Sequence, residues 1–361
     1  MMEDKLNLLR EKIDTIDDKI LELLNERMKI VQEVGKLKNS TGAPIYRPER
    51  EIAILNRLKS KNGGPLNDAA IEAIFLEIFA VSRNLERPER VAYLGPEGSF
   101  THQAAESRFG AMSEYLPIHS ISAVFKAVEA GRAKYGVVPI ENSIDGVVGE
   151  TLDLLGKSDL KIVAETYMPI HHSFASLEEK LSNIKKIYSK DIAFGQCRNF
   201  LNEHFLDDVE LIPVESTAKA AKLASGERGT AAICSNIAAK LYNLPILFEN
   251  IEDVASNMTR FIILSDFKNR RSGFDKTSIL AKLQDRPGAL VHFLEDFDKE
   301  NINLTKIESR PAEDKDFNYW FYIDFDGHID DENVQKVLQK HIHEIKWLGS
   351  YAKSKDSNAL Q

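Results

Sequence analysis

Apolar residues recur every three or four positions along the first forty residues of the chain. The spacing predicts one long helix with a narrow apolar stripe that faces another helix; the stripe consists of Leu6, Leu9, Ile13, Ile16, Ile20, Leu23, Ile30, Val34 and Leu37. Arg27 occupies the position that continues the stripe between Leu23 and Ile30. Because a guanidinium in an apolar seam is costly unless an anion meets it, we expect a helical bundle that holds an anionic ligand.

Two more helices are expected in the same region. Ser-Thr-Gly-Ala-Pro at 40–44 should end the first helix, and a second is predicted from about 48 to 61, with proline in its first turn. The glycine-rich turn 61–65 separates it from a third helix at about 67–86. Residues 1–88 are therefore predicted to form an all-helical domain.

Residues 91–268 have a different pattern, in which short β-branched runs alternate with helical stretches. Strands are predicted at 91–95, 135–140, 161–167, 230–235 and 260–265, and helices at 102–110, 122–131, 199–206 and 218–226. This alternation predicts an α/β domain with mainly parallel sheets. Its length suits two lobes with a cleft between them, and ligands of such sheets bind beyond the carboxyl ends of the strands.

A third domain is predicted over residues 275–353. Its segments read strand, helix, strand, strand, helix, strand, which is the order of a ferredoxin-like α+β domain; they lie at 277–283, 288–300, 302–309, 317–325, 332–341 and 345–352. The protein is therefore expected to be multidomain.

Composition restricts the cellular setting. The 361 residues carry a net charge of −9, and no segment is basic enough for a nucleic-acid footprint. No apolar run approaches the roughly 18 residues of a membrane span, and the N-terminus lacks the apolar core of a signal peptide. Two cysteines, Cys197 and Cys234, are too few for a disulfide framework or a metal cluster. We therefore expect a cytoplasmic protein with reduced cysteines, no metal, no membrane and no nucleic-acid partner.

Spacing along the first helix predicts a shared site. Arg27 and Lys38 are eleven residues apart, or about 16 Å along the axis, so both could reach one small ligand. Arg10 lies on the order of 25 Å from Arg27 and could join them only from a second chain packed antiparallel. The alternative is that Arg10, Lys38 and Arg50 are solvated surface residues, and that Arg27 is partly exposed with a buried stem.

The segments LREKIDTID, NERMKIVQEVGKLK and RPERE resemble the all-helical chorismate mutases that are fused to prephenate dehydratases, over about residues 5–87. The resemblance implies an intertwined dimer that rearranges chorismate to prephenate. It implies a substrate-binding set of Arg10 from the second chain with Arg27, Lys38, Arg50, Glu51 and Ser82. Such a rearrangement needs no nucleophile or metal, only a compactly held dicarboxylate and a donor near the ether oxygen.

Glu86 departs from this family, whose members have a glutamine that faces the ether oxygen. A carboxylate would repel the charge that develops there, whereas a protonated acid would donate a hydrogen bond. We hypothesise that burial keeps Glu86 protonated, so that mutase activity falls as the pH rises. Arg27, Lys38 and Glu86 are then the catalytic residues of this domain.

A hydroxyl, a guanidinium and an aromatic ring stand together at Thr259, Arg260 and Phe261, where a strand begins. They belong to six ordered motifs that resemble prephenate dehydratases over about residues 91–268: GPEGSFT, PIENSIDGVVGET, PIHHSF, QCRNFL, ESTAKAA and NMTRF. The resemblance implies two lobes similar to type-2 periplasmic binding proteins and a reaction that converts prephenate to phenylpyruvate. Loss of hydroxide needs a proton or a donor, and Thr259 matches the catalytic threonine.

The remaining candidates of this domain follow from the same motifs. Arg260 is expected to anchor a carboxylate and Phe261 to face the ring, with further substrate contacts from Ser99, Glu141, Asn142, Ser143 and Gln196. Ser216 and Thr217 either contact the substrate or merely cap a helix. For His171 and His172 we favour a structural role, since neighbouring residues on a strand point to opposite faces. Residues 189–191 read Ser-Lys-Asp where relatives often have His-Pro-Gln.

Residues 276–352 resemble an ACT domain, the small ferredoxin-like module that binds amino acids. Two motifs carry the resemblance and imply an allosteric site for L-phenylalanine; its residues are Gly288, Ala289, Leu290, Glu308, Ser309, Arg310 and Pro311. Helix amides after Gly288 could receive a carboxylate, although a glycine alone would also suit a plain turn.

Together the three regions predict a bifunctional enzyme of phenylalanine biosynthesis without a cofactor. Chorismate and prephenate are the expected ligands, L-phenylalanine the feedback inhibitor, and a homodimer or larger homo-oligomer the expected assembly. Other interpretations remain: a non-catalytic amino-acid sensor, or a dehydratase whose mutase half is degenerate or whose preferred substrate is arogenate.

Overall fold

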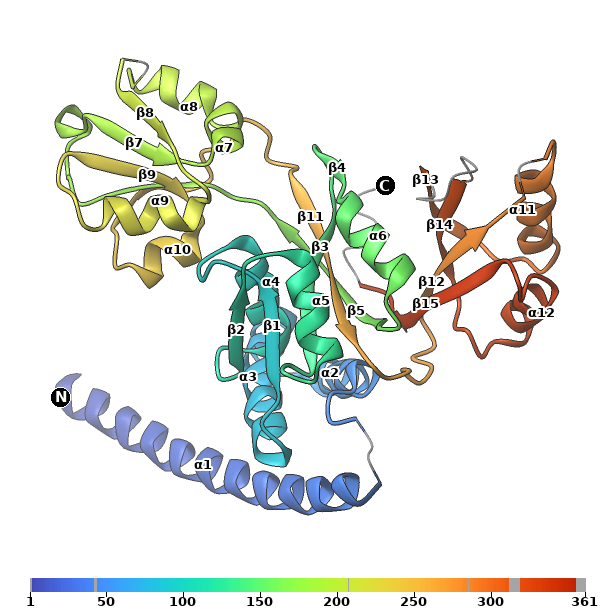
Figure 1. Cartoon of the computed structure of the whole chain (residues 1–361). Helices are drawn as coiled ribbons and strands as arrows, with labels where there is room; N and C mark the ends of the chain where they lie inside the picture. The colour runs from blue at the N-terminus through green and yellow to red at the C-terminus, as the bar shows by residue number, and fades with distance from the viewer. Residues whose placement is uncertain (1, 42–43, 207, 285, 312–318, 355–361) are drawn as a thin grey trace.

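The computed structural model describes residues 2–41, 44–206, 208–284, 286–311 and 319–354. Three domains follow one another along the chain (Figure 1): helices at the N-terminus, a two-lobed α/β domain, and a C-terminal α+β domain. None of the helices in these ranges combines the length and hydrophobicity that a bilayer span requires. The predicted fold class of each domain is confirmed.

The N-terminal domain consists of α1 (Met2–Thr41), α2 (Pro48–Lys61) and α3 (Asp68–Glu86), as predicted. Pro48 lies in the first turn of α2, where its missing N–H costs nothing. The side chain of Asn67 caps α3 by accepting a hydrogen bond from the amide of Ala70 at 2.8 Å. The carboxyl-terminal half of α1 packs on α3, and Gly35 allows the approach, since a Cβ there would lie 3.0 Å from Cα of Glu86.

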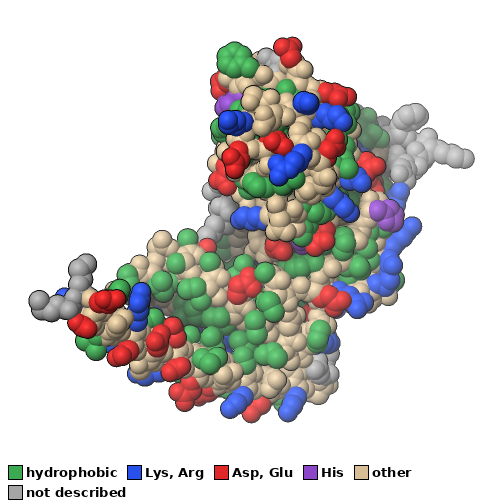
Figure 2. Space-filling view, turned by 90° about the vertical axis from the view of Figure 1, so that its left-hand side faces the viewer, with side chains coloured by type: hydrophobic (Ala, Val, Ile, Leu, Met, Phe, Trp, Pro, Cys, Tyr) green, Lys and Arg blue, Asp and Glu red, His purple; other side chains and the backbone are tan. Residues whose placement is uncertain are grey.

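The apolar stripe of α1 is exposed to solvent in this single chain. Its residues include Ile13, Ile20 and Leu23, which are 56%, 49% and 64% exposed. The first part of α1 extends away from the rest of the molecule (Figure 1), and apolar side chains lie open in the lower part of Figure 2, where α1 is found. The helix that the stripe was predicted to face is therefore not supplied by the described part of this chain.

Each lobe of the second domain is built on one sheet. The first has the strand order β2-β1-β3-β11-β5, with β4 beside β3; its strands are β1 (Arg90–Leu94), β2 (Glu114–Ile118), β3 (Tyr135–Asn142), β4 (Gly146–Val147), β5 (Lys161–Pro169) and β11 (Met258–Ser265). The second has the order β10-β6-β9-β7-β8; its strands are β6 (Ser173–Ser176), β7 (Lys186–Ser189), β8 (Glu210–Pro213), β9 (Thr230–Cys234) and β10 (Ile246–Phe248).

Helices cover both sheets. The first lobe carries α4 (Phe100–Phe109), α5 (Ile121–Glu129) and α6 (Gly149–Lys157). The second carries η1 (Leu181–Asn183), α7 (Asp191–Gln196), α8 (Arg198–Glu203), α9 (Thr217–Ala224) and α10 (Asn236–Leu241). Cys197 and Cys234 are both buried in the second lobe, where burial raises the pKa of the Cys234 thiol to about 12.

The prediction of mainly parallel sheets is wrong. Strand β1 is parallel to β2 and β3, and β7 is parallel to β8 and β9, but β11 runs antiparallel to both of its neighbours, β3 and β5. The chain leaves the first lobe after β5, builds the second lobe, and returns as β11 through the middle of the first sheet. Two segments of the chain therefore connect the lobes: one follows β5, and the other precedes β11.

The C-terminal domain has the predicted ferredoxin-like order. Its sheet is antiparallel with the order β13-β14-β12-β15; the elements are β12 (Asp275–Lys282), α11 (Ala289–Lys299), β13 (Leu304–Pro311), β14 (Tyr319–Asp326), α12 (Glu332–Lys340) and β15 (Ile345–Ala352). Residues 317–318, where the third strand was expected to begin, lie outside the described residues.

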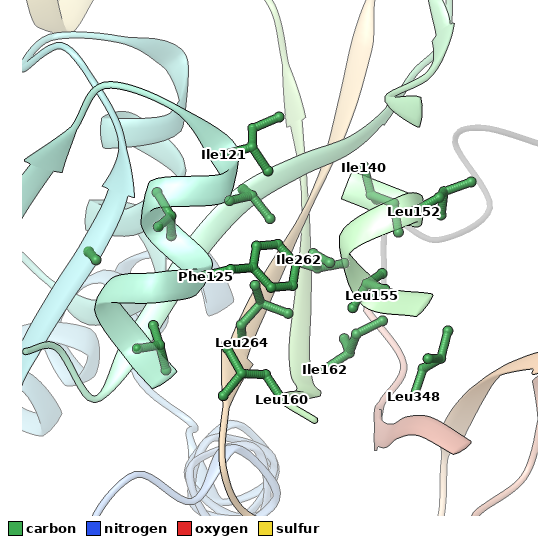
Figure 3. Close-up of a cluster of buried hydrophobic side chains, with 14 of the residues drawn as sticks. Ile121, Phe125, Ile140, Leu152, Leu155, Leu160, Ile162, Ile262, Leu264 and Leu348 are labelled. Carbon is green, nitrogen blue, oxygen red and sulfur yellow. The ribbon is translucent and has the colours of Figure 1, made fainter. Parts of the chain in front are cut away.

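One hydrophobic core joins the first lobe to the C-terminal domain. Figure 3 shows Leu348 of β15 beside Ile162 and Leu155, which belong to β5 and α6. Leu280 and Tyr351 are buried in the same cluster. The C-terminal domain is therefore packed on the first lobe through a continuous apolar interior. Because such interiors are close-packed, a displacement of one domain would strain the packing of the other.

Candidate active sites

A cleft of about 890 Å³ lies between the two lobes. Its walls include most of the residues that the dehydratase motifs predicted: Ser99, Asn142, Gln196, Thr259 and Phe261, together with Ser216 and Thr217. Thr259 and Phe261 come from β11, and Asn142 ends the neighbouring strand β3. The carboxyl end of β3 thus borders the cleft, as expected for a ligand site of an α/β sheet.

Hydrogen bonds fix the orientation of Thr259. The amide nitrogen of Asn142 lies 2.8 Å from Thr259 Oγ1, while Asn142 Oδ1 accepts from the backbone amides of Ile144 and Asp145, both at 2.9 Å. Because backbone amides can only donate, the side-chain nitrogen of Asn142 must be the group that faces Thr259. Thr259 therefore accepts from Asn142, which leaves its own O–H to donate into the cleft.

Two serines of the cleft wall also cap helices. Ser99 accepts from the amide of His102 at 3.3 Å at the start of α4, and Ser216 accepts from the amide of Lys219 at 3.1 Å at the start of α9. The alternatives that the sequence left open for Ser216 are therefore compatible, since it caps a helix and lines the cleft. Thr217, in the first turn of α9, lines the cleft as well.

His172 belongs to the cleft wall, which the sequence did not predict. Its Nε2 lies 2.9 Å from Gln196 Oε1. Burial lowers the pKa of His172, although Gln196 and Glu252 oppose this effect, so the ring is neutral at neutral pH. His171 instead pairs with Glu252. Both histidines lie in the segment between β5 and β6, so the expectation that they occupy a strand is wrong and strand alternation does not explain their different surroundings.

Arg260, Glu141 and Ser143 do not line the cleft, which corrects the prediction that they contact the substrate there. Arg260 is 2% exposed, and its guanidinium contacts Glu165 and Asp324 on the other side of the sheet. Successive side chains of a strand point to opposite faces, so a strand that directs Thr259 into the cleft directs Arg260 away from it. Ser143 bonds the backbone of Met258 and joins the ends of β3 and β11.

Glu141 follows the same rule on the adjacent strand. Its carboxylate lies 2.6 Å from Lys306 Nζ of β13, in the C-terminal domain. The cationic side chains of the cleft wall are Lys190, Lys219 and Lys222 on the second lobe. Lys190 belongs to the Ser-Lys-Asp segment, so the difference from the His-Pro-Gln of relatives places a positive charge in the cleft wall.

The helical domain brings together four predicted mutase residues from α1 and α3. Lys38 Nζ lies 2.7 Å from Glu86 Oε2, and Arg27 donates a hydrogen bond to the hydroxyl of Ser82. The Glu86 side chain is only 9% exposed. Burial lowers the pKa of Arg27, and Glu86 opposes this effect. Two cations of α1 and one carboxyl group of α3 therefore lie between these helices, and the two cations have the spacing that the sequence predicted.

The other mutase candidates are not part of this group. Arg50 and Arg10 are exposed, and Arg10 lies on the free half of α1, on the order of 25 Å along the axis from Arg27. Glu51 forms an ion pair with Arg83 of α3, which also donates to the carbonyl of Phe109 at 2.7 Å. Arg83 thus links the first domain to the second, and the sequence gave no signal for it.

The two motifs that were predicted to form an allosteric site lie on the C-terminal domain. Gly288 has φ of 82° and precedes α11, so it occupies the left-handed region that favours glycine. The amide of Ala289 donates to the carbonyl of Arg286 at 3.2 Å, which occupies one of the amides expected to receive a carboxylate; Leu290 follows in α11. Residues Glu308–Pro311 end the edge strand β13, where Arg310 lies 2.9 Å from Asp153 of α6.

Sequence-family models match all three domains. Chorismate mutase type II matches residues 9–87, Prephenate dehydratase matches residues 91–269, and ACT domain matches residues 277–343. Within the described residues, no group of three or more His, Cys, Asp and Glu side chains is placed to hold a metal ion.

Whole-length relatives share the same arrangement. A bifunctional chorismate mutase/prephenate dehydratase of Aquifex aeolicus is 44% identical over 97% of this chain and 99% of its own length. That of Pseudomonas aeruginosa is 42% identical over 98% and 99%. The crystal structure of a prephenate dehydratase from Arthrobacter aurescens, in complex with L-Phe, is 35% identical with a TM-score of 0.67 and covers 73% of this chain and 90% of that one. The chain belongs to the family of bifunctional chorismate mutase/prephenate dehydratases.

Proposed function

We propose that this protein rearranges chorismate to prephenate in its helical domain and converts prephenate to phenylpyruvate in the cleft, under feedback inhibition by L-phenylalanine. The observation that carries the proposal is the Thr259 hydroxyl, which Asn142 orients so that it can donate into the cleft. Family membership and the intact mutase cations support both activities. The buried thiols suit the reducing cytoplasm, where we expect the enzyme to act.

In the dehydratase reaction, the bond between the ring and its carboxylate breaks and the carboxylate leaves as carbon dioxide. The electrons of that bond move into the ring, which expels the ring hydroxyl as the ring becomes aromatic. Hydroxide is a poor leaving group, so a hydrogen bond or proton from Thr259 would lower the barrier. Phe261 lines the same wall and would contact the ring. Because Arg260 faces away, we assign the attraction of the two substrate carboxylates to Lys190, Lys219 and Lys222.

In the mutase reaction, the protein has only to hold the substrate compactly and to stabilise charge on the ether oxygen. Arg27 and Lys38 supply two cations, and we propose that Arg10 of a second chain supplies a third. The exposed apolar stripe of α1 supports this assembly, because a solvent-exposed row of leucines and isoleucines at coiled-coil spacing favours association with another helix. We propose a homodimer in which each site combines residues of both chains.

Glu86 is expected to make the mutase reaction dependent on pH. In the chain alone, Glu86 forms an ion pair with Lys38 at 2.7 Å, so the hypothesis requires that a substrate carboxylate takes the place of Glu86 beside Lys38. Mutase kcat should therefore fall as the pH rises, while Glu86→Gln, a permanent donor, should give a flat profile. Steady-state rates with chorismate, measured across a series of pH values for both chains, would show the difference. An unchanged profile in the variant would remove the hypothesis.

The proposed function as a whole is tested by supplying the purified chain with chorismate. We expect prephenate and then phenylpyruvate to accumulate, and L-phenylalanine to suppress the second product and to bind in calorimetry. A sensor without catalytic activity would bind phenylalanine but form neither product. A degenerate mutase would turn over only added prephenate, and arogenate supplied in parallel would reveal a preference for that substrate.

A further inference from the structure

One face of strands β3 and β11 borders the cleft, and the opposite face contacts the C-terminal domain. Thr259 and Asn142 lie opposite each other in the strand register and line the cleft. Their neighbours Arg260 and Glu141 also lie opposite each other, and both contact the C-terminal domain. The same two strands therefore present the proposed catalytic hydroxyl on one face and charged anchors to the regulatory domain on the other.

Arg260 lies at the centre of a buried group of side chains that we call the interdomain ion cluster: Glu165, Arg260, Lys276, Asp324 and Tyr351. Each member is less than 9% exposed. Arg260 Nε lies 2.9 Å from Glu165, Nη1 lies 2.6 Å from Asp324, and Nη2 lies 2.9 Å from the hydroxyl of Tyr351. Lys276 completes the charge balance at 3.0 Å from Glu165.

Three of the five members belong to the C-terminal domain, on β12, β14 and β15. Burial alone would raise the pKa of Asp324, but Arg260 and Lys276 outweigh burial and hold the pKa below its ordinary value. The carboxylate therefore stays charged and keeps its hold on the guanidinium. With three nitrogens bonded to three acceptors in different directions, Arg260 has one orientation, and the backbone of β11 is fixed with it.

We propose that Arg260 is a positioning residue for the dehydratase reaction. Its bonds to Asp324 and Tyr351 hold β11 so that Thr259, one residue earlier, points at the leaving hydroxyl of the substrate. This inference rests on the proposed function, and it deepens that function by giving the regulatory domain a direct hold on the catalytic strand. A movement of the C-terminal domain would then change turnover without any ligand contact in the cleft.

The test compares the same substitution at two interdomain links. Asp324→Asn removes one charge from the cluster, whereas Asp153→Asn removes the charge that meets Arg310 at the partly exposed link between α6 and β13. We expect Asp324→Asn to lower kcat for prephenate by about tenfold or more with KM within about twofold, because small misplacement of a catalytic group is costly. Asp153→Asn should keep the wild-type kcat. Mutase activity of the same chains and the melting temperature report whether each variant is folded.

Several outcomes would overturn the inference. One is a folded Asp324→Asn variant with wild-type kcat, which would make Arg260 a purely structural residue. Another is an equal loss of kcat in Asp153→Asn, which would show that any weakening of the contact between the C-terminal domain and the first lobe lowers turnover. If Asp324→Asn does not fold, Tyr351→Phe decides, since it removes only the hydroxyl that bonds Arg260 and Ser278 and should lower kcat by about threefold or more. A wild-type chain that turns over no prephenate would instead refute the proposed function on which the inference rests.

Discussion

Replacing Thr259 by alanine is expected to reduce prephenate turnover by about 10²- to 10⁴-fold, the usual contribution of a positioned proton donor. The side chain lines the cleft and accepts a hydrogen bond from Asn142, so its own O–H is the group that remains to donate. Chorismate mutase activity should be unchanged, because Thr259 lies in another domain. Both rates can be measured on one preparation by following phenylpyruvate formed from prephenate and prephenate formed from chorismate.

Thr259→Ser is the matched control, because it keeps the hydroxyl and loses only a methyl group. It should retain most of the turnover, although the loss of β-branching gives the side chain more rotamers. An alanine variant with unchanged dehydratase activity would contradict the assignment of Thr259. A serine variant as inactive as alanine would show that the shape of the side chain, and not its hydroxyl, is what the reaction needs.

Mixing two inactive mutase variants is expected to restore activity. Arg10→Ala and Arg27→Ala should each lower mutase kcat/KM by about 10²-fold or more, since each removes a cation that would meet a substrate carboxylate. In a shared site, a dimer of one variant chain with the other has one site with both arginines and one site with neither. Random pairing would then return about one quarter of the wild-type mutase activity.

The experiment needs chains that are co-expressed or refolded together, so that mixed dimers form. Dehydratase activity serves as the internal control, because it depends on neither arginine. Absence of recovery in mixtures proven to contain mixed dimers would show that Arg10 and Arg27 act in the same chain or not at all. A monomer at working concentration in sedimentation would refute the shared site, and it would leave the exposed stripe of α1 unexplained.

Much of the fold could be predicted from periodicity. The bounds of α2 agree with the prediction, and α3 begins one residue later than predicted because Asn67 is its cap. The predicted helix 218–226 appears as α9, and all five predicted strands of the second domain are present. These elements were visible because their apolar spacing is local. The antiparallel direction of β11 was not visible, since it depends on where the chain returns after building a second lobe.

The candidate sites show the same division. Arg27 and Lys38 could be placed on one face of α1 from helix geometry, whereas Ser82 and Glu86 of α3 were named only through the family resemblance. In the cleft, the motif around Thr259 was located, but Arg260 was assigned to the wrong face, although strand alternation should have raised the objection. The structure was needed to find the roles of Arg83, Lys190 and His172, because the groups near them belong to other elements or other domains.

By itself, the sequence determined three domains in order, their classes, the long helix with its apolar stripe, and the motifs that name the two proposed reactions. Local spacing and local motifs carry that information. The tertiary structure alone decided which side of β11 meets a ligand and that the opposite side is tied to the regulatory domain by buried charges. The reason is physical: whether a charged residue binds substrate or holds two domains together depends on what is packed against it, and packing is set by chain segments distant in sequence.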